Sequence, residues 1–145
     1  MIHSIFTDGS SNPNPGKGGW ATVVVNEKKV LVLYGCDSDT TNNRMELQAA
    51  ITAFKIAKPE DKFIVYSDSE YVVQGSMLWM FKWRKKGWVN VKNVDLWKIM
   101  YNLRLEKKYI TLVWVRGHNG NKYNEIADQY ADKAMRGQVQ GMAKV

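Results

Sequence analysis

The sequence predicts a single α/β domain in which helices cover a mixed β-sheet. Three β-rich segments joined by short turns come first, and strand-like segments then alternate with helical ones, an order typical of such a sheet. The length of 145 residues suits one hydrophobic core. Hydrophobic residues make up 45% of the chain and charged residues 24%, which excludes a disordered, collagen-like or low-complexity protein. No apolar run approaches the roughly 18 residues that would span a bilayer.

The first three predicted strands are β-branched or aromatic runs separated by turn-forming residues. They cover residues 2–7, 20–26 and 30–34. The first strand should end at Asp8, where a loop rich in Gly, Asn and Pro begins and continues to Gly19. Residues 26–29 connect the second and third strands as a hairpin.

A helix is predicted directly behind residues 41–43, whose Thr and Asn side chains favour helix caps. Its apolar residues recur at helical spacing through about residue 57 and are Leu47, Ala50, Ile51 and Phe54. Residues 63–67 then form a short apolar strand that ends at Asp68. Because the helix connects the first strand to this one, the two strands should lie parallel, with a right-handed crossover.

The C-terminal half of the chain alternates helical and β patterns. Its predicted helices cover residues 69–86, in two pieces near Gly75, and then residues 94–107 and 122–135. A basic loop occupies residues 88–93, and residues 110–115 form the last predicted strand. We expect residues 1–137 to form the domain and residues 138–145 to be a disordered tail.

The net charge of +7 is concentrated in one segment. Residues 82–108 hold nine Lys or Arg and two Asp or Glu, so the rest of the chain is close to neutral. A localised basic segment indicates a polyanionic partner, with nucleic acid first and an anionic membrane surface second. On charge alone, a solvated basic face without a partner explains it as well.

The cysteine content and the N-terminal residues indicate in which cellular compartment the protein is expected. The only cysteine is Cys36, so an internal disulfide is excluded. The first residues do not combine a basic segment with a long apolar one, so we expect no signal peptide. Both observations predict a cytoplasmic protein.

Four carboxylates are predicted to converge at one rim of the sheet. Asp8 and Asp68 end strands, and Glu46 and Asp128 border the buried faces of their helices. Any one of them alone is explained by a cap, a turn or an exposed surface position. Together, without a cation, they would repel one another. Oxygen-only ligands favour Mg²⁺ or Mn²⁺ over zinc, and two such ions would form a phosphoryl-transfer site.

Several segments, in matching order and spacing, resemble type 1 ribonuclease H. They are residues 6–10, 40–47, 67–69, 71–72, 93–97 and 114–118, with Asn124, Glu125 and Asp128. The run Thr-Thr-Asn-Asn-Arg-Met-Glu-Leu at residues 40–47 is the most specific, and the likeness covers residues 2–136.

The resemblance implies a five-stranded mixed sheet with helices on both faces. It further implies endonucleolytic hydrolysis of the RNA strand of RNA–DNA hybrids, with two Mg²⁺ ions that Mn²⁺ can replace, leaving 3′-hydroxyl and 5′-phosphate ends. By position, Asp8, Glu46, Asp68 and Asp128 match the catalytic metal ligands, and His118 matches a mobile catalytic histidine. We expect a monomer whose partner is the hybrid and not a membrane.

The resemblance also implies substrate contacts. Residues expected along the RNA minor groove or at a DNA-strand phosphate pocket are Ser11, Asn14, Thr41, Asn42, Asn43, Arg44 and Asn124. Glu70 is expected near the substrate too, although many relatives carry a neutral side chain there. A basic protrusion at about residues 79–93, here called the handle, would grip the DNA strand through Trp79, Lys82, Trp83, Arg84, Lys85, Lys86 and Trp88. The competing interpretations are that residues 41–43 only cap a helix and that Trp79 and Trp83 belong to the core.

Two other functions are compatible with such a fold. A noncatalytic nucleic-acid-binding module would be favoured by a missing carboxylate, and none of the four is missing. An integrase-like or resolvase-like polynucleotidyl transferase is disfavoured by the handle and by the full segment at residues 40–47.

Overall fold

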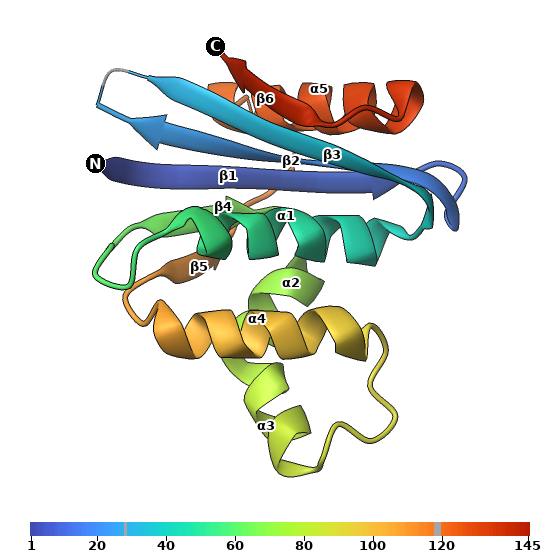
Figure 1. Cartoon of the computed structure of the whole chain (residues 1–145), viewed down its shortest axis with the longest axis vertical. Helices are drawn as coiled ribbons and strands as arrows, with labels where there is room; N and C mark the ends of the chain where they lie inside the picture. The colour runs from blue at the N-terminus through green and yellow to red at the C-terminus, as the bar shows by residue number, and fades with distance from the viewer. Residues whose placement is uncertain (28, 118–119) are drawn as a thin grey trace.

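A six-stranded sheet runs through the molecule (Figure 1). The computed structural model describes residues 1–27, 29–117 and 120–145. The strands are β1 (Ile2–Ser11), β2 (Gly16–Asn26), β3 (Val30–Thr40), β4 (Ile64–Ser67), β5 (Thr111–Trp114) and β6 (Gly141–Lys144). They lie in the order β5-β4-β1-β2-β3-β6. β1, β4 and β5 are parallel, which confirms the predicted crossover through the first helix, and the other pairs are antiparallel.

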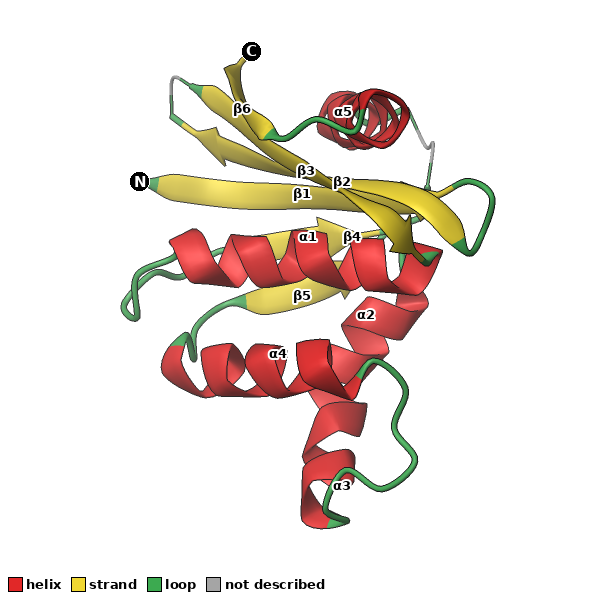
Figure 2. Ribbon diagram, turned by 45° about the vertical axis from the view of Figure 1, so that its right-hand side comes forward, coloured by secondary structure: helices red, strands yellow, loops and turns green. Residues whose placement is uncertain are grey.

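Helices cover both faces of the sheet, as the predicted fold class requires (Figure 2). They are α1 (Asn42–Ile56), α2 (Glu70–Gln74), the π-helical turn η1 (Gly75–Trp79), α3 (Met80–Lys85), α4 (Val94–Glu106) and α5 (Lys122–Gly137). α1, α2 and α4 share one apolar cluster with the sheet, and α5 forms a second cluster on the opposite face. Within the described ranges, none of these helices combines the length and apolar character needed to cross a membrane.

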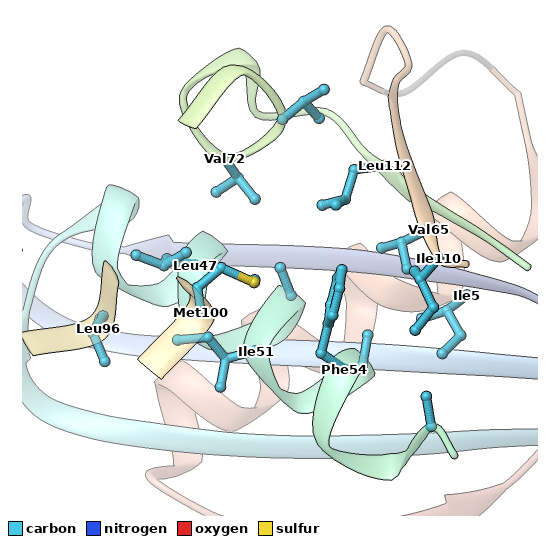
Figure 3. Packing of buried hydrophobic residues seen from close by; sticks show 14 of the residues in the cluster. Ile5, Leu47, Ile51, Phe54, Val65, Val72, Leu96, Met100, Ile110 and Leu112 are labelled. Carbon is cyan, nitrogen blue, oxygen red and sulfur yellow. The ribbon is translucent and has the colours of Figure 1, made fainter. Parts of the chain in front are cut away.

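The larger apolar cluster holds α1 against the sheet. The predicted apolar series on α1 is buried, with Leu47, Ala50, Ile51 and Phe54 at most 1% exposed. Figure 3 shows Leu47, Ile51 and Phe54 gathered with Ile5 and Val65 from the strands, and Ala50 belongs to the same cluster. Consecutive residues of β1 point to opposite faces, so Ile5 joins this cluster while Phe6 joins the one under α5.

The predicted end of the first strand at Asp8 is wrong. β1 continues through Ser11, because β2 pairs with it as far as Ser11 opposite Gly18. β4, in contrast, stops opposite Thr7. Asp8 is therefore the first residue of β1 beyond the end of its parallel neighbour, and its side chain still lies at the predicted rim.

The tail is a strand in the structure, and the sheet has six strands instead of five. β6 pairs with β3 from Leu31 opposite Lys144 to Tyr34 opposite Gly141, so the prediction of a disordered segment at residues 138–145 is wrong. β3 would otherwise form an edge of the sheet, and β6 pairs with the first half of that edge, at residues 31–34.

The predicted irregularity near Gly75 is confirmed, but the predicted division into two pieces is wrong. The segment is a continuous right-handed helical run in which the π-helical turn η1, beginning at Gly75, separates α2 from α3. A Cβ atom on Gly75 would lie 2.2 Å from Cη2 of Trp97, and Trp97 is fully buried. The absence of a side chain at this position lets η1 pack directly on α4, and α3 then projects away from the sheet (Figure 1).

Candidate active site

Three carboxylates from three elements meet at the rim of the sheet. Asp8 comes from β1, Glu46 from the first half of α1, and Asp68 follows the last residue of β4. One oxygen from each lies within 4.8 Å of the other two. The structure therefore brings together three of the four residues predicted as metal ligands, in a spacing that a cation could bridge.

The fourth predicted ligand, Asp128, lies beside this cluster. A small pocket is lined by Thr7, Asp8, Asp68, Gly117, Asn124 and Asp128. The Asp128 and Asp8 side chains line this pocket together. Asn124, one turn before Asp128 on α5, reaches the same pocket. The predicted catalytic His118 falls outside the described residues.

Gly9 sets the position of Glu46. A Cβ atom on Gly9 would lie 2.3 Å from the carbonyl carbon of Met45 and 2.4 Å from the backbone nitrogen of Glu46. The first half of α1 thus lies directly on the backbone of β1, which only glycine permits. The Gly9 N–H also donates to Asp8 Oδ1 at 2.8 Å. One residue therefore positions two of the carboxylates.

The cluster is electrostatically unfavourable without a cation. The pKa of Asp8 is raised to about 8. The largest cause is burial, and repulsion from Asp68 and the neighbouring Asp128 carboxyl adds to it. The pKa of Glu46 is raised well above its usual range, first by burial and then by repulsion from the Asp8 and Asp68 carboxylates.

Two oxygens of the cluster are free to bind a metal. Glu46 Oε1 and Asp68 Oδ1 are buried, and neither has a hydrogen-bond partner among the described residues. Buried polar atoms rarely stay unpaired, and oxygen atoms from carboxylates are the ligands that Mg²⁺ and Mn²⁺ prefer. The donor set therefore fits a hard divalent cation.

The raised pKa of Asp8 predicts how the stability of the metal-free protein depends on pH. The folded state holds this proton up to about pH 8, whereas the unfolded state releases it near 3.8. The free energy of unfolding should therefore fall between these two pH values, on the order of a few kcal/mol. Thermal unfolding with a chelator should give a lower Tm at about pH 8 than at about pH 5. Asp8→Asn should remove much of the fall, and a wild-type Tm that rises over this interval would contradict the account.

A second, polar pocket lies at the start of α1. It is lined by Asn14, Pro15, Thr41, Asn42, Asn43, Lys92 and Asn93. The Ser11 backbone N–H donates to Asn42 Oδ1 at 2.6 Å, and the Asn42 backbone N–H donates to Asn14 Oδ1 at 3.1 Å. Thr41 caps the helix by accepting from the Arg44 N–H. Four predicted substrate residues therefore share this pocket, and one of them, Thr41, also caps α1.

Arg44 lies next to this pocket, because one of its hydrogen-bond partners, Asn93, lines it. Its guanidinium donates twice to Asp95, at 2.7 and 2.9 Å, and once to Asn93 Oδ1 at 3.3 Å. These hydrogen bonds lower the pKa of Asp95. Lys92, which was not predicted, is the cation that lines the pocket within the described residues. The basic loop at residues 88–93 was the sequence signal that could have identified it.

The handle residues divide between two surfaces. Trp83 is half-buried with its ring 5.3 Å from that of Trp97, so the core interpretation is correct for part of its surface. Trp79 lies beside it at 6.2 Å and is 37% exposed. On another surface, Arg84 and Trp88 line a pocket with Lys98, Tyr101 and Asn102. The remaining predicted handle residues, Lys82, Lys85 and Lys86, are exposed.

Two predicted substrate residues have settings that the sequence did not indicate. Ser11 is 7% exposed, and its hydroxyl donates to the Pro13 carbonyl at 3.0 Å. Its side chain is therefore occupied within the loop, and its backbone holds Asn42. Glu70 is exposed at the first position of α2, two residues from Asp68.

Comparison with known proteins identifies the family. The RNase H family model matches residues 2–136. The ribonuclease H of Agrobacterium fabrum is 46% identical over 136 residues, covering 90% of this chain and 92% of the relative. The ribonuclease H of Hahella chejuensis is 44% identical over 137 residues, covering 91% and 92%. Among solved structures, LC9-RNase H1, a type 1 RNase H with the type 2 active-site motif, superposes with a TM-score of 0.79 at 27% identity, covering 98% of this chain and 76% of that one. With its carboxylate cluster at the expected rim, the chain belongs to the ribonuclease H family of nucleases.

Proposed function

We propose that this protein is an endonuclease that hydrolyses the RNA strand of RNA–DNA hybrids and leaves 3′-hydroxyl and 5′-phosphate ends. The observation that carries the proposal is the meeting of Asp8, Glu46 and Asp68 at one rim, with two buried oxygens that lack partners among the described residues. Membership of the ribonuclease H family supports the reaction class.

Asp8, Glu46, Asp68 and Asp128 would hold two Mg²⁺ ions, which Mn²⁺ can replace. When bound, such ions supply Lewis-acid activation of water and stabilise charge on the leaving 3′-oxygen. The chain itself contributes a preorganised set of carboxylates, because Gly9 fixes the separation of β1 and α1. His118 remains predicted to carry a proton to or from the site.

The polar pocket would receive a phosphate of the DNA strand. Asn43 lies three residues before Glu46 on α1, which is about 4.5 Å along the helix axis. A duplex bound at the carboxylates therefore also passes over this pocket. Lys92 supplies the positive charge there, and the amides of Asn14, Asn42 and Asn43 supply polar contacts. The same amides could test for the 2′-hydroxyl of RNA.

A noncatalytic nucleic-acid-binding module on the same fold is the alternative. Such a module gains nothing from three clustered carboxylates whose mutual repulsion must be overcome, whereas an active site requires them. Predictions of a monomer and of a cytoplasmic location stand on the sequence alone.

A cleavage assay on three substrates tests the proposal. A labelled RNA–DNA hybrid, duplex RNA and duplex DNA of the same sequence are incubated with the protein, with and without Mg²⁺. We expect internal cleavage of the RNA strand in the hybrid alone, and only with the metal. Tight binding of the hybrid without cleavage under any metal condition would favour the noncatalytic alternative.

The handle should contribute mainly to binding. Lys85 and Lys86 are exposed at the end of α3, so the double change to alanine should weaken hybrid binding by removing phosphate contacts. Each lost contact lowers the slope of log K against log salt by about 0.7–0.9. The maximal rate at saturating substrate should change little. The measurement is a salt titration of hybrid binding in metal-free buffer.

A matched control removes the same charge elsewhere. Lys58 and Lys62 are exposed in the connection between α1 and β4, and their double change to alanine should leave the salt slope closer to the wild-type value. Equal slopes for the handle variant and the wild type would mean that the handle is a solvated surface only.

A further inference from the structure

We propose that Trp114 is a positioning residue for the metal ligand Asp68. Its indole N–H donates to the backbone carbonyl of Asp68 at 3.0 Å. Trp114 is the last residue of β5 and is 42% exposed. This proposal rests on the proposed function, because it assigns Asp68 to a metal site.

The bond joins the last residue of β5 to the backbone just beyond the end of β4. The pairing of β4 with β5 ends with the Val115 N–H, which donates to the Ser67 carbonyl at 2.9 Å. The β4–β5 backbone bonds use alternate carbonyls, those of Phe63 and Ser67 among them, so the Asp68 carbonyl is not an acceptor in that ladder. The indole of Trp114 donates to it from β5. The tryptophan side chain therefore ties β5 to the residue that carries the carboxylate.

The helix that follows does not use this carbonyl. The Val72 N–H, which could have bonded to Asp68 O, donates to the Ser69 side chain, and the Val73 N–H donates to Ser69 O. No hydrogen bond from the described residues holds Oδ1 of the Asp68 carboxylate in place. Its direction is therefore set largely by its own backbone, to which Trp114 is hydrogen-bonded.

Loss of the indole N–H should loosen this backbone and weaken metal binding. A hydrogen bond between neutral groups changes an equilibrium by about two- to tenfold. We expect Trp114→Phe to bind Mn²⁺ about fivefold more weakly than the wild type by calorimetry on the free protein. The Mg²⁺ concentration for half-maximal cleavage should rise by the same factor. The rate at saturating Mg²⁺ and the KM for the hybrid should stay close to wild type.

A second variant separates the hydrogen bond from ring packing. Benzothienylalanine at position 114 keeps the shape of tryptophan and replaces the N–H by sulfur, so it should weaken Mn²⁺ binding as Trp114→Phe does. Tyr109→Phe is the control, because it removes one polar group from an exposed aromatic ring just before β5. This variant should bind Mn²⁺ like the wild type. Wild-type affinity in the benzothienylalanine variant, or an equal loss in Tyr109→Phe, would overturn the assignment of Trp114. Failure of the wild-type protein to bind Mn²⁺ would instead overturn the proposed function.

Discussion

Asp68→Asn should abolish nearly all cleavage of an RNA–DNA hybrid and leave binding of the hybrid largely intact. The amide keeps the shape of the side chain and removes the negative charge that a divalent cation needs. We expect a rate at least about 100-fold below wild type, which corresponds to about 2.7 kcal/mol of barrier. Binding should persist, because the handle and the polar pocket lie on other elements. Single-turnover cleavage and metal-free binding measure the two quantities separately.

A conservative change outside the cluster is the control for Asp68→Asn. Glu60 is exposed in the connection between α1 and β4, and Glu60→Gln removes the same charge without touching the site. It should cleave at the wild-type rate. If Asp68→Asn keeps more than about a tenth of the activity, roughly 1.4 kcal/mol of barrier, Asp68 is not a metal ligand of the reaction.

Gly9→Ala should damage stability and activity together. The added methyl group would lie 2.3 Å from the carbonyl carbon of Met45, so α1 must move away from β1. Forcing an extra methyl into a packed interior costs about 1–3 kcal/mol. The displacement also moves Glu46 from Asp8, and a shift of about 1 Å at an active site can cost about 100-fold in rate. Thermal unfolding and single-turnover cleavage of the variant check both effects.

Gly137→Ala is the matched glycine control. A Cβ atom there would meet only the Val139 methyl groups, at 3.6 Å, which is an ordinary contact. Gly137 is the last residue of α5, more than two helical turns beyond Asp128, so Tm and rate should stay near wild type. Equal Tm values and rates for Gly9→Ala and the wild type would show that the contact between β1 and α1 does not position the site.

Local patterns predicted the central part of the fold well. The apolar series on α1 and the short apolar β4 each carry their own signal, and the helix between β1 and β4 determines that those strands are parallel. Strand lengths were predicted less well. Residues 8–11 and 35–40 are rich in Gly, Asp, Ser and Thr, and they become strands because β2 runs alongside both. Such pairing depends on partners that the local sequence does not reveal.

The candidate site, like the fold, could be predicted only in part. The carboxylates could be predicted because each stands at the end of an element with a clear pattern, and such ends meet at one rim of an α/β sheet. Arg44 stays a predicted substrate residue, and its ion-pair partner Asp95, 51 positions away along the chain, was not predicted. The Trp114 contact with Asp68 spans 46 positions. No pattern in the neighbouring sequence indicates either contact, because both depend on how α4 and β5 pack in the folded protein.

Analysis of the cleaved ends tests the central claim most directly. The RNA strand of a hybrid, cleaved in the presence of Mg²⁺, is examined by mass spectrometry. The account predicts internal cuts with 5′-phosphate and 3′-hydroxyl ends, dependent on the metal and absent with Asp68→Asn, because an activated water attacks the phosphorus. Ends carrying a 2′,3′-cyclic phosphate, formed without metal and equally by the Asp68→Asn variant, would mean that the RNA 2′-hydroxyl is the nucleophile and that the carboxylate cluster is not the catalytic site.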